Sequence, residues 1–103
     1  MTPEKMVANV CDEYLRSLGA YIFKPVQMGM GASTLDRLCC IQGKFVAVEY
    51  KRAGVFDCTP RQRQVIKAIC AAGGLAFTTD SLGRTQKYLQ DHLLGLYNPE
   101  TGE

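Results

Sequence analysis

The sequence predicts a single α/β domain in which a mixed sheet is flanked by helices. Its length of 103 residues is typical of one compact domain. The composition, 47% hydrophobic and 21% charged, is that of an ordinary globular protein. Segments with the helical period alternate with short strand-like runs, so the predicted element order is α-β-β-β-α-β-α.

The first helix is predicted from the periodicity of its apolar residues. From Met6 to Leu18 these residues recur every three or four positions, as on one face of a helix. Thr2 can cap the N-terminus, Pro3 suits the first helical position, and Gly19 can end the helix.

Three strand-like runs follow. Pro25 ends the first run, and residues 27–34, which contain two glycines and no periodicity, predict a loop. The Gln42-Gly43-Lys44 segment favours a hairpin between the second and third runs. The predicted strands are therefore 21–24, 35–41 and 45–51.

The rest of the chain predicts a helix, a strand and a last helix. Thr59 and Pro60 suit the start of the second helix, and Gly73-Gly74 ends it. A strand at 75–79 leads to a helix that begins at Asp80 or Ser81 and runs to about Leu94. Residues 98–103 are predicted to form a flexible tail, so the predicted domain spans 1–97.

Composition excludes several classes of protein. No apolar run approaches the ~18 residues of a membrane span, and the N-terminus lacks a signal-peptide core. We therefore expect a cytoplasmic protein with no membrane partner. The five cysteines have no zinc or disulfide spacing and are expected to be reduced thiols, mostly in the core. A single histidine, His92, excludes a His-rich zinc hydrolase, and a net charge of +2 permits nucleic-acid binding without arguing for it.

The hairpin carries the chemistry. Glu49 and Lys51 share one strand face, and Tyr50 takes the other. A two-residue Gln42-Gly43 turn, or a four-residue loop around it, pairs Asp36 with Glu49, with Cβ atoms about 5 Å apart. Two facing carboxylates repel unless a shared proton or a cation lies between them.

A divalent metal resolves this repulsion. Oxygen ligands suit Mg²⁺ or Mn²⁺, which hold phosphate oxygens and lower the pKa of bound water. Lys51 would orient that water or stabilise the charge on a phosphoryl group. The pattern indicates metal-assisted hydrolysis of phosphodiester bonds. The alternative for Glu49 and Lys51 is an ordinary solvated ion pair on one strand face.

Two helix residues are weaker candidates for the same site. Gln62 lies on the apolar row of the second helix, and Glu4 lies in the apolar sector of the first. Gln62 could instead be a partly exposed residue of the first turn, and Glu4 could serve only the helix dipole.

Asp36, Glu49-Tyr50-Lys51 and Gln62 of the TPRQ segment, in this order, resemble the signature of the PD-(D/E)XK nuclease superfamily. The chain looks most like the small stand-alone VRR-NUC domains over roughly residues 2–80, through TPEK, GAYIFKPV, LDRL, GKFVAVEYK and AAGGLAF. The resemblance implies a restriction-endonuclease-like core with the order α-β-β-β-α-β. One departure is Leu35, where the family commonly has a proline.

The resemblance also implies roles for these residues. Asp36, Glu49 and the Tyr50 carbonyl would bind Mg²⁺ or Mn²⁺, with Glu4 as a further acid near the metal. Lys51 would be the catalytic lysine, and Gln62 would help position either this lysine or the water. Stand-alone members resemble Holliday-junction resolvases, which implies a homodimer that acts on branched DNA, and such domains are often phage-encoded, which here would mean the host cytoplasm.

Basic residues near the site are candidate DNA contacts, and the 27–33 segment is a candidate DNA-facing flap. These basic residues are Lys24, Arg37, Lys44, Arg52, Arg61 and Arg63. The predicted function is a metal-dependent endodeoxyribonuclease. Its rivals are a catalytically silent DNA-binding module on the same fold and a protein-interaction domain in which the carboxylates are incidental.

Overall fold

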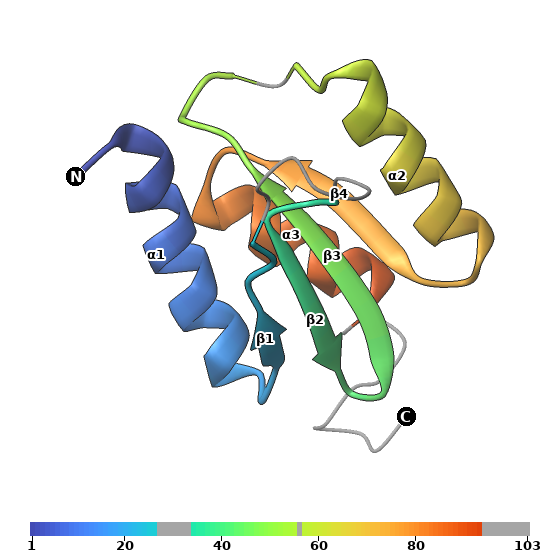
Figure 1. Ribbon diagram of the computed structural model, residues 1–103. Coiled ribbons are helices and arrows are strands. Elements are labelled where there is room, and N and C mark those ends of the chain that lie inside the picture. The colour runs from blue at the N-terminus through green and yellow to red at the C-terminus, as the bar shows by residue number, and fades with distance from the viewer. Residues whose placement is uncertain (27–33, 56, 94–103) are drawn as a thin grey trace.

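A computed structural model describes residues 1–26, 34–55 and 57–93 and confirms the predicted α/β fold and element order (Figure 1). The helices and strands are α1 (Pro3–Ser17), β1 (Tyr21–Phe23), β2 (Arg37–Ile41), β3 (Lys44–Tyr50), α2 (Pro60–Ala71), β4 (Leu75–Thr79) and α3 (Leu82–His92). The boundaries differ from the predicted ones by a few residues at most, as expected where helices and strands fray.

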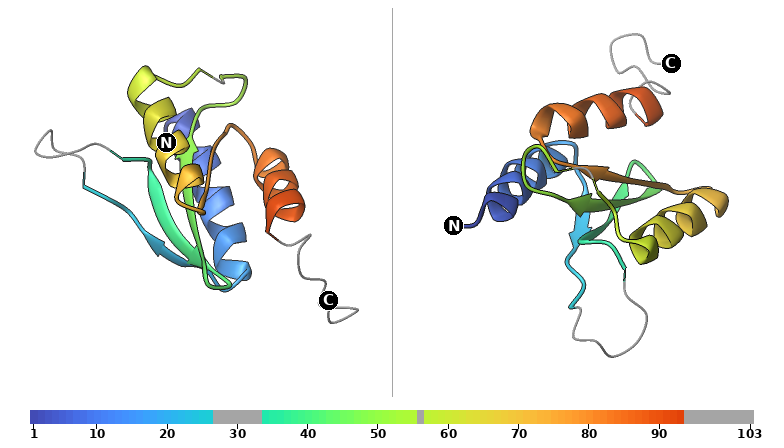
Figure 2. Two further views of the ribbon diagram at one scale, coloured as in Figure 1. Left: turned by 90° about the vertical axis from the view of Figure 1, so that its right-hand side faces the viewer. Right: turned by 90° about the horizontal axis from the view of Figure 1, so that it is seen from above.

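The four strands form one mixed sheet in the order β1-β2-β3-β4. The first three strands are antiparallel neighbours, whereas β3 and β4 are parallel. A parallel pair needs a long crossover connection, and α2 supplies it. Figure 2 shows α1 and α3 on one face of the sheet and α2 on the other.

The β2–β3 hairpin has the predicted two-residue turn. Gln42 and Gly43 both have positive φ, 53° and 77°, as a tight hairpin turn of type I′ requires. Glycine adopts this backbone region without steric cost, so Gly43 favours the turn. In the resulting register Ile41 faces Lys44 and Arg37 faces Val48. One step beyond the end of this ladder, Asp36 lies next to Glu49, as predicted.

Side-chain caps determine where the helices begin. The Thr2 hydroxyl accepts the Lys5 N–H at 3.2 Å at the start of α1. At the start of α2, Thr59 and Gln62 form a capping box in which each side chain bonds the backbone N–H of the other. Ser81 caps α3, which selects the second of the two predicted starting points.

The core has two parts because side chains alternate along the strands. The larger part lies between the sheet and α1 with α3, and Leu15, Ile41, Val46, Val48 and Leu89 are fully buried in it. The smaller part lies under α2 and contains Leu35, Ala47 and Ala76, with Val65, Ile66 and Ile69 packed against it. Glu49 follows the Ala47 face, so its side chain lies on the α2 side of the sheet.

The expectation that most cysteines lie in the core is wrong. The five thiols are free, but only Cys11 and Cys39 are buried, whereas Cys58 is half-buried and Cys40 and Cys70 are exposed. Cys40 is exposed because α2 does not extend over that part of the sheet.

No helix in the described residues is long and apolar enough to cross a membrane. The predicted 27–33 flap and the 98–103 tail lie outside the described residues, and the domain extent of 1–97 stays a prediction.

Candidate active site

Asp36 and Glu49 lie side by side at the end of the β2–β3 ladder. The Asp36 N–H donates to Glu49 Oε1 at 3.2 Å, and the Tyr50 N–H donates to Asp36 Oδ2 at 2.9 Å. The two carboxylates therefore replace backbone carbonyls as acceptors for the last two N–H groups of the ladder. This arrangement fixes both side chains next to each other, and it places the Tyr50 backbone beside them.

The negative charges of Asp36 and Glu49 are only partly compensated by the positive charge of Lys51. Glu49 is only 7% exposed. Burial, and secondly the charge of Asp36, raises the pKa of Glu49 to about 7, although Lys51 acts in the opposite direction. A carboxyl group with such a pKa is poised to lose its proton when a cation binds.

Lys51 and Gln62 complete the cluster. Lys51 Nζ lies 3.9 Å from Glu49 Oε2 and donates to Gln62 Oε1 at 3.1 Å. Gln62 Nε2 in turn donates to the same Glu49 oxygen at 2.9 Å. Because the Thr59 N–H also bonds Gln62 Oε1 at 3.0 Å, the α2 capping box holds the amide that positions the lysine. The structure thus brings together Asp36, Glu49, Lys51 and Gln62.

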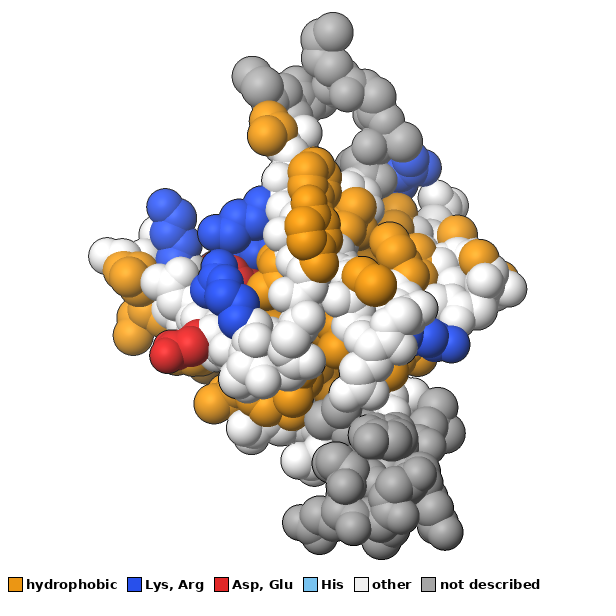
Figure 3. Space-filling model, turned by 90° about the horizontal axis from the view of Figure 1, so that it is seen from below, with side chains coloured by type: hydrophobic (Ala, Val, Ile, Leu, Met, Phe, Trp, Pro, Cys, Tyr) orange, Lys and Arg blue, Asp and Glu red, His pale blue; other side chains and the backbone are white. Residues whose placement is uncertain are grey.

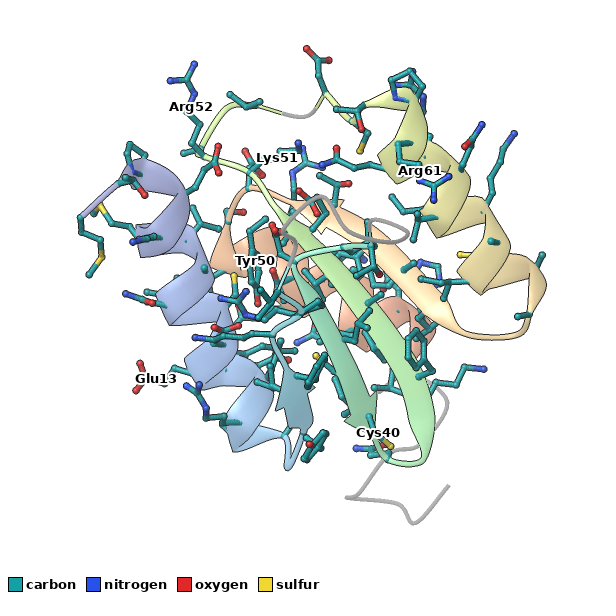
Figure 4. All side chains as sticks on the ribbon, viewed as in Figure 1. Glu13, Cys40, Tyr50, Lys51, Arg52 and Arg61 are labelled. Atoms are coloured by element: carbon teal, nitrogen blue, oxygen red, sulfur yellow. The ribbon has the colours of Figure 1, made fainter. Side chains whose placement is uncertain are left out.

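Asp36, Glu49 and Gln62 line an open pocket of about 230 Å³ between the sheet and the first turn of α2. Figure 4 shows Lys51 and Arg61 approaching this end of the sheet from β3 and α2, whereas Glu13 extends outward from α1. Arg61 is exposed and lines the pocket, so it brings a positive charge to the carboxylates. The residues that line the pocket are Thr34, Asp36, Glu49, Thr59, Arg61, Gln62 and Val65. Sequence reasoning missed Thr34 and considered Thr59 only as a helix cap.

The donor set fits a hard divalent cation. Asp36 and Glu49 offer carboxylate oxygens, and the adjacent Tyr50 backbone offers a carbonyl, which are ligands that Mg²⁺ and Mn²⁺ accept. Within the described residues no three His, Cys, Asp or Glu side chains are grouped for one metal ion. Such a site would therefore be completed by waters or phosphate oxygens, as is common for Mg²⁺.

Glu4 does not join the carboxylate pair. It is exposed in the first turn of α1, and no described group of three acids includes it. The apolar side of α1, on which the helical wheel places Glu4, packs on the sheet face opposite to the pocket. The structure gives no support to Glu4 as a metal ligand, and its acidity suits the helix N-terminus.

Arg37, a predicted DNA contact, is paired with Asp12 inside the domain. Its Nε lies 3.1 Å from both oxygens of Asp12, its Nη2 lies 3.0 Å from Asp12 Oδ2, and its guanidinium stacks 5.2 Å from the centre of the Tyr50 ring. Tyr50 also donates its hydroxyl to Asp12 Oδ1 at 2.8 Å, so burial and Asp12 raise the pKa of Tyr50. The position of Asp12, one turn after the buried Ala8 and three residues before Leu15, could have revealed this buried acid.

The other predicted DNA contacts lie at the surface. Lys24, Arg52 and Arg63 are exposed, and the Arg63 Nη1 donates to the Cys58 carbonyl at 2.7 Å. Lys44 is at the hairpin turn, at the opposite end of β3 from Glu49. Of the predicted contacts, Arg61 is therefore the one that lines the carboxylate pocket.

Comparison with known proteins supports this fold. No family model matches the sequence, and no curated protein matches it. A solved structure described as a "VRR_NUC domain" matches with a TM-score of 0.75 and 23% sequence identity, and the match covers 90% of this chain and 99% of the other. The chain therefore has the fold of a VRR_NUC domain, the fold that the sequence resemblance predicts.

Proposed function

We propose that the chain is a divalent-metal-dependent endodeoxyribonuclease that acts as a homodimer on branched DNA. The observation that carries the proposal is the pair of the half-buried Asp36 and the buried Glu49, which lines an open pocket and has Lys51 at its side. A structural role alone does not explain two adjacent carboxylates beside a lysine, because their repulsion costs stability. The VRR_NUC fold supports a nuclease-type activity.

Asp36, Glu49 and the Tyr50 carbonyl would hold the metal. When bound, Mg²⁺ or Mn²⁺ polarises a phosphate oxygen and lowers the pKa of a bound water. Glu49 has a raised pKa, so it would release its proton to solvent as the cation binds.

The remaining residues act on the phosphodiester. The Lys51 ammonium, held by Gln62, would lie beside a non-bridging oxygen and stabilise the negative charge that develops as water attacks phosphorus. The bond from phosphorus to one ester oxygen then breaks, and that oxygen takes up a proton. Arg61, on the pocket wall, would contact the phosphate and hold it in place.

The branched substrate and the dimer are supported by size and by resemblance. A domain of about 100 residues covers little of a DNA junction, and a symmetric pair presents two pockets to it. Sedimentation velocity of the free protein tests this part directly, since a monomer at micromolar concentration would contradict the dimer.

The activity is tested by cleavage of labelled four-way junction, flap, duplex and single-stranded DNA with Mg²⁺, Mn²⁺ or EDTA. Wild type is compared with Lys51→Ala and with Lys87→Ala, which removes an exposed lysine from α3 on the other side of the sheet. We expect cutting that requires metal, is lost in Lys51→Ala and is retained in Lys87→Ala. The ranking of substrates distinguishes a junction resolvase from a general nuclease.

Two results would contradict the proposal. Binding of DNA without cutting by any variant would identify a catalytically silent DNA-binding module. If the protein shows no salt-sensitive binding of DNA, the result would instead identify a protein-interaction domain.

A further inference from the structure

Three aromatic side chains lie exposed on the sheet face that α2 only partly covers. Tyr21 is 70% exposed, Phe23 52% and Phe45 46%. We call these three residues the aromatic strip. Neighbouring exposed side chains of this size on a small domain indicate a contact surface, because a contiguous apolar patch left in water is typical of interaction sites.

The strand register places the aromatic strip on the same face as the carboxylates. Tyr21 pairs with Cys40 and Cys40 pairs with Phe45, while Phe23 pairs with Leu38. Directly paired residues share a face, and Leu38 packs under α2 on the Asp36 side. Figure 3, in which the molecule is seen from below, shows hydrophobic side chains exposed on that side.

Tyr21 and Phe45 flank a small side chain. With strands about 4.8 Å apart, the Cα atoms of Tyr21 and Phe45 are separated by about 10 Å across Cys40. The short Cys40 side chain lies between them on this row, and the Phe45 ring extends the row toward Gly74 and the C-terminal end of α2.

The aromatic strip is continuous with the candidate active site. Phe23 lies opposite Leu38. Asp36 comes two residues before Leu38, so the Cα atoms of Asp36 and Leu38 are about 7 Å apart in an extended chain. Lys24 follows Phe23 and is exposed, so a positive charge is available to a phosphate at this edge. Nucleotides next to one held at the carboxylates would therefore reach the rings.

We propose that the aromatic strip binds unpaired nucleobases of DNA, which stack on its exposed rings. This proposal rests on the proposed nuclease function and gives its substrate a single-stranded segment next to the cut. Bases inside a duplex are stacked on their neighbours, so only unpaired bases offer a free face to an aromatic ring. Aromatic rings on an open sheet suit that ligand, since stacking tolerates any base.

A second copy of the chain is the competing occupant of this face. Sheet-edge pairing gives it little support, because β1 has only three residues and short edge strands resist such pairing. The two occupants respond differently to a change from aromatic to aliphatic side chains, since leucine preserves apolar contact but cannot stack.

The test is binding of fluorescein-labelled poly(dT) and of a matched duplex in EDTA, where no cutting occurs. The variants are Tyr21→Leu, Phe45→Leu and Tyr21→Trp, with Met6→Leu as the control for an exposed apolar residue on α1. We expect Tyr21→Leu and Phe45→Leu to weaken poly(dT) binding roughly 5- to 150-fold, the range for loss of one stacked base. The affinity of the leucine variants for duplex DNA should change less than about twofold, and so should the affinity of Tyr21→Trp and Met6→Leu for poly(dT). Thermal unfolding verifies that each variant is folded.

Equal poly(dT) affinity of wild type and both leucine variants would overturn the proposal, as would no poly(dT) binding by wild type. Sedimentation velocity of the Tyr21→Ala/Phe45→Ala double variant gives a further check. A shift from dimer to monomer in that variant would identify the face as an interface between copies and also overturn the proposal. Metal-dependent cleavage is measured separately. If the leucine variants bind poly(dT) as wild type does, the nuclease proposal still stands, and if wild type binds bases but does not cleave DNA, the base-binding proposal still stands while the nuclease proposal fails.

Discussion

Replacing Asp36 by Asn should stabilise the metal-free domain at alkaline pH while removing its response to metal. An Asn side-chain oxygen can still accept the Tyr50 N–H, and the Asp36 backbone N–H still reaches Glu49, so the local hydrogen bonds are preserved. The change removes one negative charge beside a carboxylate that is 7% exposed. Repulsion within the pair is thereby lost without a cavity.

The magnitude follows from the pKa of Glu49. This pKa rises from an ordinary value of 4.5 to about 7 in the folded domain, and each pKa unit corresponds to about 1.4 kcal/mol. The ionised pair therefore costs the fold about 3 kcal/mol above pH 7, mostly through burial and secondly through Asp36. Because Asp36 is the second cause, its replacement removes part of this cost, and each 1 kcal/mol removed corresponds to a Tm increase of roughly 4–8 °C for a domain of this size.

The sign with pH follows from proton binding. Because the pKa of Glu49 is higher in the folded than in the unfolded state, the folded domain holds this proton more tightly between pH 4.5 and about 7. The stability that the Glu49 proton contributes is complete below pH 4.5 and is lost as the pH rises through about 7. The gain from Asp36→Asn should thus be clear at pH 8 and small at pH 5, where Glu49 is neutral.

The assay is thermal unfolding at pH 5 and pH 8, in EDTA and in millimolar Mg²⁺ or Mn²⁺, with Glu13→Gln on the outer side of α1 as the control. Metal that binds the folded state at 100 times its Kd adds about 2.7 kcal/mol, so wild type should gain several degrees and Asp36→Asn should not. Equal metal-induced shifts in the two proteins would refute the shared metal site. A Tm for Asp36→Asn no higher than wild type at pH 8 in EDTA would refute the electrostatic argument.

Three further predictions concern the register, the opposite sheet face and the α2 cap. Inserting one residue into the Gln42-Gly43 turn should abolish cleavage and the metal-induced Tm shift while leaving most of the circular dichroism signal, because it displaces Asp36 from Glu49; retained activity would show that the pairing is not needed. Arg37→Ala should lower the free energy of unfolding in urea by about 3–5 kcal/mol, because it leaves Asp12, which is 2% exposed, without its cation; a change near zero would show that the Tyr50 hydroxyl suffices. Thr59→Ala should cost about 1 kcal/mol of stability and lower kcat while it changes the Kd for metal little, because the cap holds Gln62 and hence Lys51. An unchanged kcat would mean that Gln62 does not position the lysine.

The sequence by itself determined the hairpin and the order of elements. The turn at Gln42-Gly43 and the alternation of Phe45 to Glu49 are local features, and together they select one register, because a slip by one residue would turn the apolar side chains to the wrong face. That register places Asp36 beside Glu49. The cap at Thr59 and Pro60 likewise determined where α2 begins, and hence that Gln62 lies in its first turn.

Only the tertiary structure decided which side chains meet between elements. The pairing of Arg37 with Asp12, the exposure of Glu4 and the contact of Gln62 with Glu49 depend on how α1 and α2 pack on the sheet, which local periodicity does not encode. The same holds for the exposed rings of Tyr21 and Phe45. They match a strand pattern as well as buried residues do. Tyr21 is exposed because the α2 side chains pack on β2, β3 and β4 and leave β1 open, and Phe45 is half-exposed because it lies near the start of β3, at the C-terminal end of α2.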